Sequence, residues 1–549
     1  LMRDILVTLD DRLTPERRKR GWQVVAQSGG VNKTGANLIW LADLAIARAA
    51  AVGDETLLGR AARRAEAEIK VSTDEGVQPD YSFHQHREHL QTFHYGNSYV
   101  RDLSRLAWIL RGTPWAFSEE KVRILVDYVV EGMDWMRRGE YTVPGTLDRA
   151  ATRPGALGHK RLTPVLERLQ AILPDDPDGR MKAVIDREAG RGRPLVGFRH
   201  FPRSDFTAYH REDFSFFLKT MSTRTLPAEK INGENRKGDR MYCSDAMLMR
   251  DGREYYNMMP VWDWFWMPGI TIAARLPDFK RCPDFKRCSF VGGVGNGQSG
   301  MTAIDYRFGD VLTARKAYFC HGDRVVCLIG GMRAPDHPIR VATALDQCRL
   351  DGPVTIGVGN GQKTVETSET IDDVTWLHHR GVAYVLFAPG RVNIKVGEVS
   401  GSWQSINAAR SGEPVTDRVF RPLLYHGKRS VDGSSGYVLA PASTPRAAAV
   451  IAGNPGFAVL ANGRDVQAVR FDGGPVMAAF YRPGALKHDS RDLMRVDHPC
   501  LVTAEGENLW VSNPAHKACR IRIEAPDQPP RLVSVPGNGQ AVRAKKAGR

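Results

Sequence analysis

Four histidines and one tyrosine crowd the stretch SFHQHREHLQTFHYGN, residues 82–97, although the chain of 549 residues contains only 15 histidines. Imidazole binds metals and transfers protons near neutral pH, so both kinds of chemistry have to be weighed. His84 and His86 form an H-x-H pattern with Glu88 and His89 nearby, and zinc uses such residue types. No H-E-x-x-H run and no matching downstream ligand set accompanies them, so we expect no metal here.

The alternative to metal binding is proton transfer by one histidine and the tyrosine, His86 and Tyr95. We interpret His84, His89 and His94 as surface or loop residues without a role in this chemistry. A lone tyrosine in HYGN is more often an aromatic residue at the edge of the core, so the surrounding motifs have to decide.

Four further motifs carry polar or aromatic residues. TGANLIW contains Asn37 and Trp40, TLDRAATRPG contains Arg149 and Arg153, and EKINGENRKG contains Glu229 and Asn232. The fourth, EYYNMMPVWDWFWMPGIT, contains Trp262, Trp264 and Trp266. Their alternation favours core positions for most of these tryptophans, and one ring remains a candidate for stacking against a ligand.

The elements that must position these residues change in character near residue 190. Before it, apolar residues recur at helical spacing in five segments, 37–51, 55–69, 98–112, 118–138 and 162–173. Ser118 is the expected N-cap of the fourth segment, which begins with two glutamates. Short connections predict antiparallel helical hairpins. After residue 190, short β-rich runs such as KAYFCHGDRVVCLIGG alternate with turn residues, which predicts an all-β block.

Composition narrows the class of protein. The hydrophobic fraction of 42% and the charged fraction of 25% are typical of globular domains, and the length predicts two or three of them. No run of 18 apolar residues predicts a membrane span, and the first 20 residues lack the apolar core of a signal peptide. The net charge of +15 favours a polyanionic partner, but no nucleic-acid-binding motif accompanies it.

Two other patterns have structural explanations. GNGQSG at residues 295–300 matches G-x-G-x-x-G, but no βαβ unit surrounds it, so we do not expect dinucleotide binding. The eight cysteines contain no C-x-x-C pair, which argues against a structural zinc site, and we expect buried thiols. Cys320 and Cys327 flank a predicted turn, which leaves a disulfide between them open. The hexapeptide PDFKRC is repeated at residues 277–288, and Cys282 lies within that repeat.

At these motifs the sequence resembles polysaccharide lyase family 8, the hyaluronan, chondroitin and xanthan lyases. The E-x-x-N-x-E-N run from Glu229 and the P-V-W-D-W run from Pro260 are the most specific elements. The spacings also agree with the family, with 49 residues from Asn37 to His86, 9 from there to Tyr95 and 54 on to Arg149. The resemblance extends through the C-terminal segments and covers most of the chain. Only 36 residues precede Asn37, fewer than in most family members, so we expect a truncated fragment or a short variant.

The resemblance implies a multidomain α+β fold, in which an incomplete α/α toroid precedes antiparallel β-sandwich domains. We expect a helical catalytic domain over residues 1–180, a central β-sandwich over 190–435 and a small β-domain over 436–549. It also implies a partner, an acidic polysaccharide, and a secreted or periplasmic location. We expect a monomer that requires no cofactor; relatives with calcium are known, but no oxygen-ligand cluster supports that ion here.

The activity that the resemblance implies is β-elimination at a 4-linked uronic acid. A proton leaves C5, the bond to O4 breaks, and a C4=C5 double bond remains. The resemblance gives this chemistry to Asn37, His86, Tyr95, Arg149 and Glu229. An amide donor such as Asn37 would stabilise the charge that develops on the uronate carboxylate. Free tyrosine is mostly protonated at neutral pH, and nearby Arg149 and His86 would favour its phenolate. Tyr95 could then take the C5 proton and return it to O4, while Glu229 orients His86 or Arg149.

Substrate binding is expected from Arg153, Asn232, Trp40 and Trp262. Arg153 could clamp a carboxylate or sulfate, or form a structural ion pair, and we favour the clamp. Chondroitin or hyaluronan is the expected substrate. Xanthan or another microbial uronate polysaccharide is an alternative, and a noncatalytic carbohydrate-binding relative is a third hypothesis.

Overall fold

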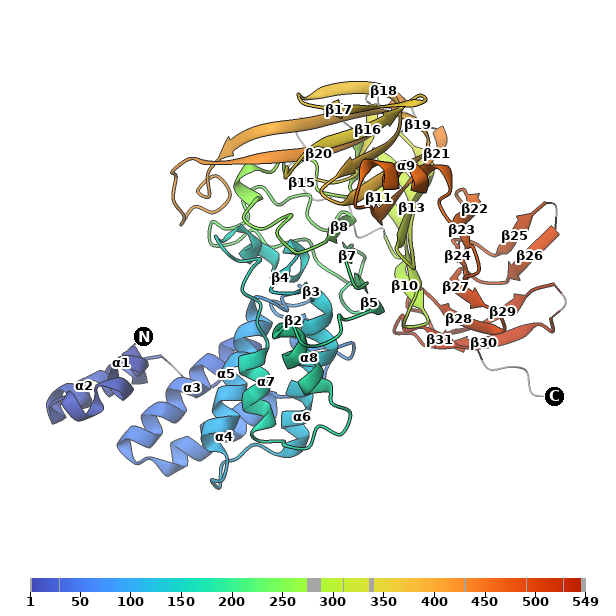
Figure 1. Cartoon of the computed structure of the whole chain (residues 1–549). Coiled ribbons are helices and arrows are strands. Elements are labelled where there is room, and N and C mark those ends of the chain that lie inside the picture. The colour runs from blue at the N-terminus through green and yellow to red at the C-terminus, as the bar shows by residue number, and fades with distance from the viewer. Residues whose placement is uncertain are drawn as a thin grey trace. The chain divides into compact units, whose positions relative to one another are not determined.

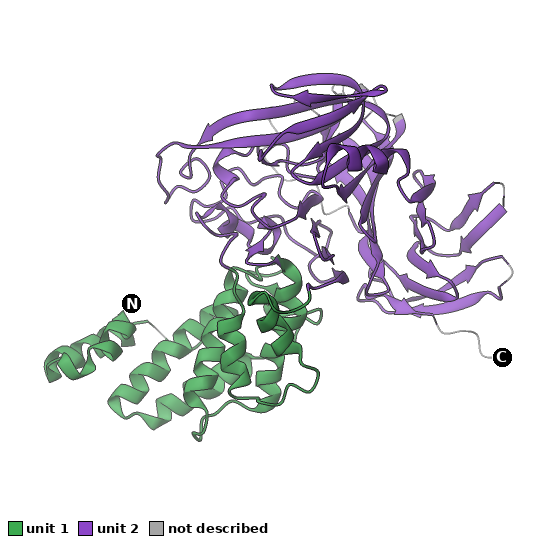
Figure 2. Cartoon of the chain, viewed as in Figure 1, with its two compact units in different colours: residues 1–137, 160–193 green, residues 138–159, 194–549 purple. Residues whose placement is uncertain are grey.

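The computed structural model describes residues 2–28, 30–273, 288–309, 311–334, 340–428, 431–489, 491–526 and 528–544. Figure 1 shows the whole chain, and Figure 2 colours its two compact units. The helical unit comprises residues 1–137 and 160–193, and the sheet unit comprises residues 138–159 and 194–549. The predicted order, helices first and antiparallel sheets after, is confirmed. The boundaries of three domains remain a prediction.

Eight α-helices and two short strands build the described part of the helical unit. The helices are α1 (Met2–Thr8), α2 (Pro15–Ala26), α3 (Gly35–Val52), α4 (Glu55–Glu68), α5 (Tyr95–Leu110), α6 (Glu119–Asp127), α7 (Thr163–Gln170) and α8 (Arg180–Glu188). The two strands, β1 (Gly76–Val77) and β2 (Phe83–His84), pair with each other. A further strand, β3 (Arg137–Arg138), has one residue in each unit. The five predicted helical segments all contain helix. Four have ends that differ by a few residues, whereas the fourth, 118–138, is α-helical only over Glu119–Asp127.

The connection between α3 and α4 shows how local sequence produces the predicted hairpins. Gly53 ends α3 at φ +71°, and its N–H donates to the carbonyl of Ala49. The Asp54 side chain then accepts from the backbone N–H of Leu57 and caps α4. A left-handed glycine followed at once by a capping aspartate reverses the chain in two residues.

The predicted helix over 118–138 is regular only over its first half. After α6 the chain continues as a π-helical turn, Tyr128–Met133, and a 3₁₀ turn, Asp134–Met136. Gly132 lies in the π turn, and a Cβ there would approach the carbonyl oxygen of Tyr81 to 2.0 Å. The close approach of two backbones therefore coincides with the change of helix type. Ser118 precedes the helix as expected, but its side chain makes no capping hydrogen bond.

Helix α3 alone among the described helices has the length and hydropathy that a membrane span requires. It packs against α4 and α5, and its buried side chains, which include Leu38, Ile39, Ala42 and Ile46, recur every three or four residues. Asp43 on the same helix forms an ion pair with Arg105 at 2.6 Å. These contacts are those of a core helix of this unit.

The sheet unit begins with short elements, β4 (Tyr141–Thr142) and the 3₁₀ turns Pro144–Thr146 and Asp148–Thr152. A four-stranded antiparallel sheet follows, with β5 (Gly197–Phe201), β6 (Phe206–His210), β7 (Ser215–Lys219) and β8 (Asp245–Met249) in that order. The segment between β7 and β8 carries the E-x-x-N-x-E-N run. A further 3₁₀ turn, Met259–Val261, precedes the large sheet.

Thirteen strands form the large antiparallel sheet. Nine follow one another in the order β10 (Val291–Gly295), β11 (Gly300–Phe308), β12 (Leu312–His321), β13 (Arg324–Arg333), β21 (Val431–Pro441), β19 (Val382–Gly401), β18 (Glu369–His379), β16 (Val354–Val358) and β17 (Gly361–Val365). The other four are β9 (Thr271–Ala273), β14 (Arg340–Ala344), β15 (Cys348–Arg349) and β20 (Val415–Lys428). The hairpin predicted within KAYFCHGDRVVCLIGG is β12–β13.

Strand β19 is 20 residues long and changes partner along its length. Its first residues pair with β21, and residues 391–401 pair with β20. Pro389 and Gly390 lie between these two parts, where a missing N–H and a missing side chain interrupt an ordinary ladder. The β19–β20 hairpin projects a loop, residues 402–414, beside the segment between β7 and β8 (Figure 1).

The C-terminal part of the sheet unit packs two sheets face to face. The six-stranded sheet contains β22 (Phe457–Asn462), β23 (Val466–Phe471), β24 (Val476–Phe480), β27 (Cys500–Glu505), β28 (Asn508–Ser512) and β31 (Val542–Arg543). The four-stranded sheet contains β25 (Gly484–His488), β26 (Arg491–Val496), β29 (Cys519–Glu524) and β30 (Arg531–Val535). Side chains from both, such as Phe480, Val502 and Ile521, form one apolar core. Helix α9 (Pro445–Gly453) precedes this part.

The cysteines that the structure describes are free thiols, and all but Cys519 are buried. Cys320 pairs across the β12–β13 ladder with Val325, and Cys327 pairs with Tyr318. The two cysteines are therefore offset along the hairpin, and the disulfide left open by the sequence does not form. Cys282 and most of the duplicated hexapeptide lie outside the described residues.

Candidate active site

The N-terminus of α3 carries Asn37 and is held by two side chains from other elements. Gly35 N–H donates to Glu68 at 2.6 Å, and Ala36 N–H donates to the Gln85 side-chain oxygen at 3.0 Å. Gly35 has φ +55°, and a Cβ there would lie 2.1 Å from the same Gln85 oxygen. The glycine of the GAN motif is thus required for this close approach. The half-buried Asn37 side chain makes no hydrogen bond to any residue that the structure describes, so its amide remains available.

Tyr95 is the first residue of α5, and three aromatic rings surround it. Its ring centroid lies 4.4 Å from His94, 4.8 Å from His86 and 5.8 Å from Trp40. Trp40 lies one turn after Asn37 on α3, so the same helix brings both toward the tyrosine. We call Asn37, Trp40, His86, His94 and Tyr95 the tyrosine cluster. Tyr95 is buried, whereas the Trp40 side chain is exposed.

A fixed loop positions His86 in this cluster. His86 and Arg87 have φ +57° and +71°, left-handed values that ordinary residues rarely adopt. Glu75 holds the loop, because it accepts hydrogen bonds from Gln85, from the Arg87 N–H and from Thr34. The His86 carbonyl in turn lies 2.6 Å from the His89 ring nitrogen. Backbone strain at His86 is therefore offset by a connected set of hydrogen bonds.

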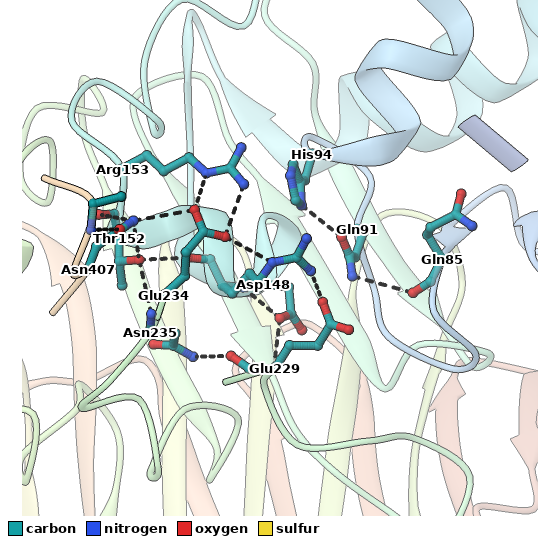
Figure 3. Close-up of polar contacts among 12 residues, drawn as sticks. Gln85, Gln91, His94, Asp148, Thr152, Arg153, Glu229, Glu234, Asn235 and Asn407 are labelled. Carbon is teal, nitrogen blue, oxygen red and sulfur yellow. Dashed lines mark hydrogen bonds and ion pairs between the residues drawn. The ribbon is translucent and has the colours of Figure 1, made fainter. Parts of the chain in front are cut away.

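Two of the three histidines that were predicted to be surface or loop residues without a role, His84 and His94, make specific contacts inside the helical unit. His84 is not a surface residue, since it is almost fully buried in β2 opposite Gly76. His94 stacks on Tyr95 and lies 2.8 Å from the Gln91 side chain, as Figure 3 shows for the latter contact. Spacing alone did not reveal either position, because both depend on where the loop after β2 turns. His89 is half-buried and lies in that loop.

The sheet unit holds a second group of predicted residues around Arg149. The guanidinium is buried and contacts two carboxylates, Glu229 through Nη1 and Glu234 through Nε at 2.9 Å. Glu234 also receives two hydrogen bonds from Arg153, at 2.7 and 3.0 Å (Figure 3). We call Arg149, Arg153, Glu229 and Glu234 the arginine cluster. Two guanidinium groups and two carboxylates alternate within it, so their formal charges cancel.

Asp148 fixes the backbone on which Arg149 and Glu229 stand. Its Oδ1 accepts from the N–H of Arg149 at 2.6 Å and from the N–H of Glu229 at 2.8 Å. Its Oδ2 accepts from the Tyr242 hydroxyl at 3.0 Å. Asp148 is fully buried and has φ +54°, a conformation that aspartate tolerates better than most residues. Asp148 was not among the predicted site residues, although it stands directly before Arg149 in TLDRAATRPG.

The E-x-x-N-x-E-N run forms a compact loop between β7 and β8. Asn232 and Gly233 both have positive φ and reverse the chain, which brings Glu229 and Glu234 to the same guanidinium. Asn235 closes the loop by donating to the Glu229 carbonyl at 3.0 Å. Glu234 and Asn235 belong to the same motif, but only Glu229 and Asn232 were predicted site residues. Asn232 is exposed, and its side chain makes no contact with the described residues that would fix it.

Two further assignments can be compared with the structure. Arg153 makes the ion pair that the sequence left as an alternative, and its side chain is 35% exposed. Trp262 was a candidate for sugar stacking, but it is buried and packs edge-to-face against Tyr255 and Trp264. A sugar needs an open ring face, so the structure corrects this assignment. Trp264 and Trp266 are also buried, as the alternation predicted.

Electrostatics differ between the arginine cluster and the buried groups behind it. Burial raises the pKa of Glu234, but Arg153 and Arg149 outweigh it, and the net pKa lies below the usual value. Burial lowers the pKa of Lys219 to about 8 and raises the pKa of Asp245 to about 7. Burial, followed by the Asp148 charge, raises the pKa of Tyr242 well above its usual value. Glu234 is therefore ionised, and Tyr242 is a neutral donor, at neutral pH.

The structure shows no group of three or more metal-ligating side chains among the residues it describes. The predicted site residues instead fall into one cluster in each unit. Asn37, Trp40, His86 and Tyr95 belong to the helical unit, while Arg149, Arg153, Glu229 and Asn232 belong to the sheet unit.

Family models of the polysaccharide lyases match three consecutive parts of the chain. The family 8 N-terminal alpha-helical domain matches residues 2–187, the super-sandwich domain residues 196–451, and the C-terminal beta-sandwich domain residues 458–521. The chain belongs to polysaccharide lyase family 8. It is accordingly an enzyme of the polysaccharide lyase class, as the motifs predicted.

Within family 8, the chain is 30% identical to a chondroitinase-AC from Pedobacter heparinus, over 94% of this chain and 75% of that protein. It is 26% identical to a hyaluronate lyase from Thermasporomyces composti, over 100% of this chain and 76% of the relative. A xanthan lyase from Bacillus sp. strain GL1 is 25% identical, over 85% of this chain and 56% of the relative.

Solved structures agree with this placement. A chondroitinase AC lyase, solved with oligosaccharides, superimposes with a TM-score of 0.88 at 27% identity, covering 97% of this chain and 81% of that one. A chondroitin AC lyase from Streptomyces coelicolor A3 gives a TM-score of 0.83 at 21% identity, over 99% and 82% of the two chains, which shows the shared fold.

Proposed function

We propose that this polysaccharide lyase cleaves 4-linked uronic-acid polysaccharides by β-elimination, with Tyr95 removing the C5 proton and then protonating O4. The observation that carries the proposal is the composition of the tyrosine cluster. Tyr95 packs against the imidazoles of His86 and His94 and against the Trp40 ring. One helical turn before Trp40, the Asn37 amide has no partner among the described residues. A proton carrier, groups that stabilise its charge and a donor for an oxyanion are all present.

Each residue of the cluster has a separate task in this mechanism. The Asn37 amide donates to the uronate carboxylate and stabilises the negative charge that develops when C5 loses its proton. His86 lies against the Tyr95 ring and stabilises the phenolate. The phenol formed by the first transfer then delivers its proton to the departing O4. A single group that performs both transfers acts on one face of the sugar, as in a syn elimination.

The arginine cluster contributes positioning in this proposal. Glu229 and Glu234 hold the Arg149 guanidinium in one orientation, and Asp148 fixes the backbone beneath it. These carboxylates keep Arg149 in place, and Arg153, whose side chain is partly exposed, contacts a carboxylate or sulfate of the substrate. Asn232 contacts sugar hydroxyls, and the exposed Trp40 ring offers a face for stacking.

Chondroitin or hyaluronan is the proposed substrate class. The chondroitinase-AC from Pedobacter heparinus and the hyaluronate lyase from Thermasporomyces composti align with 94% and 100% of this chain, whereas the xanthan lyase aligns with 85% of it. Xanthan is the alternative, because that relative also shares the family. We further propose a secreted or periplasmic monomer that needs no metal or organic cofactor for the elimination.

Digestion of a panel of polymers tests the proposal. Purified protein is incubated with chondroitin, hyaluronan, xanthan and a uronate-free control polymer, and the ultraviolet absorbance of the unsaturated uronate is followed. Absorbance is expected with chondroitin or hyaluronan. Absorbance with xanthan alone would mean that xanthan, and not chondroitin or hyaluronan, is the substrate. Polymer binding without absorbance from any substrate would favour the noncatalytic relative.

A further inference from the structure

The charge of the arginine cluster is internally compensated, whereas three cations in the neighbouring loops are not. Arg236 and Lys237 follow the E-x-x-N-x-E-N run, and Arg410 lies in the 402–414 loop. All three are exposed, and none forms an ion pair with a carboxylate among the described residues. Lys230, in the same segment, is neutralised by Asp239 at 2.6 Å. The unpaired cations are thus a specific subset and not the whole basic surface.

The two loops that carry these cations are linked to each other. Arg236 N–H donates to the Ile406 carbonyl at 2.9 Å, and its Nη1 donates to the Gln404 carbonyl at 3.3 Å. Lys237 Nζ donates to the Ser405 hydroxyl at 3.3 Å. Two of the cations therefore lie along the surface of the β19–β20 loop, and Arg410 belongs to that same loop.

The linked loops also join the arginine cluster. Asn407, fully buried between them, donates to Glu234 at 3.4 Å, a contact drawn in Figure 3. Ala408 N–H donates to the Gly233 carbonyl at 2.9 Å, and Ile406 is fully buried beneath the loop. This anchoring gives the cations a fixed backbone that is continuous with the predicted substrate-binding residues.

We propose that Arg236, Lys237 and Arg410 form a cationic strip that binds uronate or sulfate groups of a long acidic polysaccharide, beyond the sugars at which cleavage occurs. The proposal rests on the function proposed above and adds a binding site to it. Unpaired, exposed guanidinium and ammonium groups attract a polyanion at long range and contact its anionic groups directly. Glu413, also exposed in the 402–414 loop, is the acidic residue nearest to Arg410 in sequence. Asp239 near Lys237 is paired with Lys230, and Glu234 near Arg236 is paired with two arginines, so the strip keeps a net positive charge.

The strip makes a prediction about chain length. A long polymer carries many anionic groups beyond the cleaved bond that the strip can bind, whereas a tetrasaccharide supplies only the sugars around that bond. Removing the strip should therefore weaken binding of the polymer and leave the tetrasaccharide unaffected. Exposed ionic contacts are each worth about 1.5-fold to 3-fold in affinity, so three should together give roughly 3-fold to 30-fold.

The experiment compares two triple variants of the full chain. The strip variant carries Arg236→Gln, Lys237→Gln and Arg410→Gln. The matched control carries Lys487→Gln, Arg491→Gln and Arg520→Gln, which remove the same number of exposed cations from the C-terminal sandwich, again without ion pairs among the described residues. KM and kcat are measured with chondroitin polymer and with its tetrasaccharide, at low and at physiological salt.

The strip variant should show a KM for polymer that is about 3-fold to 30-fold higher at low salt, with kcat not lowered and the tetrasaccharide unchanged. Its KM for polymer should also depend less steeply on salt than that of the wild type. The control variant should match the wild type. An unchanged KM for polymer, an equal rise for the tetrasaccharide, or an equal rise in the control variant would each overturn the proposal.

A binding measurement separates failure of the strip from failure of the proposed function. The strip substitutions are added to Tyr95→Phe, and polymer affinity is measured without turnover. If the wild-type protein produced no unsaturated product from any polymer, the proposed function would fail, yet this affinity would still decide the strip. Equal polymer affinity with and without the strip substitutions would refute the strip even if the enzyme is active.

Discussion

The tyrosine cluster and the arginine cluster differ in how far their side chains are engaged by the rest of the protein. In the first, the Asn37 amide has no partner among the described residues and the Trp40 ring is exposed. In the second, each guanidinium is held by carboxylates, and Asp148 holds their backbone. Groups that act on the substrate must be available to it, whereas groups that position other residues are held by the protein. Arg153, whose side chain is 35% exposed, is the member of the arginine cluster that can do both. The comparison predicts that substitutions in the two clusters separate activity from stability.

Tyr95→Phe should have the largest effect on activity. The variant removes one oxygen, and the ring contacts with His86, His94 and Trp40 remain, so the fold should survive. Loss of one general acid–base group typically costs 10²–10⁴-fold, and here both transfers are lost, so we expect a fall in kcat of at least about 10³-fold to 10⁴-fold. Absorbance of the unsaturated product measures the rate, and circular dichroism checks the fold. A rate within tenfold of the wild type would remove Tyr95 from its role.

Arg149→Ala should lower both the activity and the stability of the protein. Its removal leaves Glu229 without its guanidinium partner and Glu234 with Arg153 alone. Breaking a buried ion pair by removing one partner costs about 3–5 kcal/mol, so denaturant unfolding should shift and activity should fall. Arg149→Lys keeps the charge but cannot contact both carboxylates in the same way. Its stability and activity should therefore lie between those of the wild type and those of Arg149→Ala. Full stability in Arg149→Ala would contradict the positioning role.

Asn37→Ala should lower activity and leave stability nearly unchanged. The amide has no hydrogen bond among the described residues, so unfolding should change by no more than about 0.5 kcal/mol, as at ordinary surface positions. Loss of one oxyanion donor typically lowers kcat by about 10²–10³-fold. Asn37→Asp adds a negative charge beside the uronate and should be at least as inactive. A destabilised but active Asn37→Ala protein would reverse the comparison.

Glu234→Gln should give the smallest effect, visible as a change in pH dependence. The pKa of Glu234 is lowered in the folded protein, so its ion pairs stabilise fully above the unfolded value of about 4.3 and are lost as the pH falls below it. The variant should lose about 1–3 kcal/mol at neutral pH and show a flatter stability curve between about pH 5 and pH 3. Denaturant unfolding at pH 7 and pH 4 measures this. An unchanged slope would mean that other carboxylates dominate the acid response.

The sequence predicted the elements better than their contacts. Apolar periodicity located α3, α4, α5 and α7, because each buries one face against its neighbours. It did not predict the π turn after α6, because that turn coincides with the approach of the Tyr81 carbonyl to Gly132 from elsewhere in the chain. Long-range backbone contacts of this kind leave no local pattern.

The site was predictable to the same extent. The sequence motifs contained the residues of both clusters, but they did not show which residue contacts which. Glu234 meets Arg149 from 85 residues away, and only the left-handed turn at Asn232 and Gly233 makes that contact possible. The burial of His84 and Trp262 likewise depends on packing between distant segments, so their types alone suggested surface or binding roles.

Product analysis in water labelled with heavy oxygen tests the central claim most directly, because elimination through Tyr95 uses no water to break the bond. Wild-type protein and Tyr95→Phe are incubated with the polymer that the panel identifies, and the product ends are examined by mass spectrometry. The account predicts that the wild type releases unsaturated uronate ends without heavy oxygen, and that Tyr95→Phe releases almost none while still binding the polymer. Saturated nonreducing ends together with heavy oxygen in freshly formed reducing ends of the wild-type products, or unsaturated ends formed at the wild-type rate by Tyr95→Phe, would contradict it.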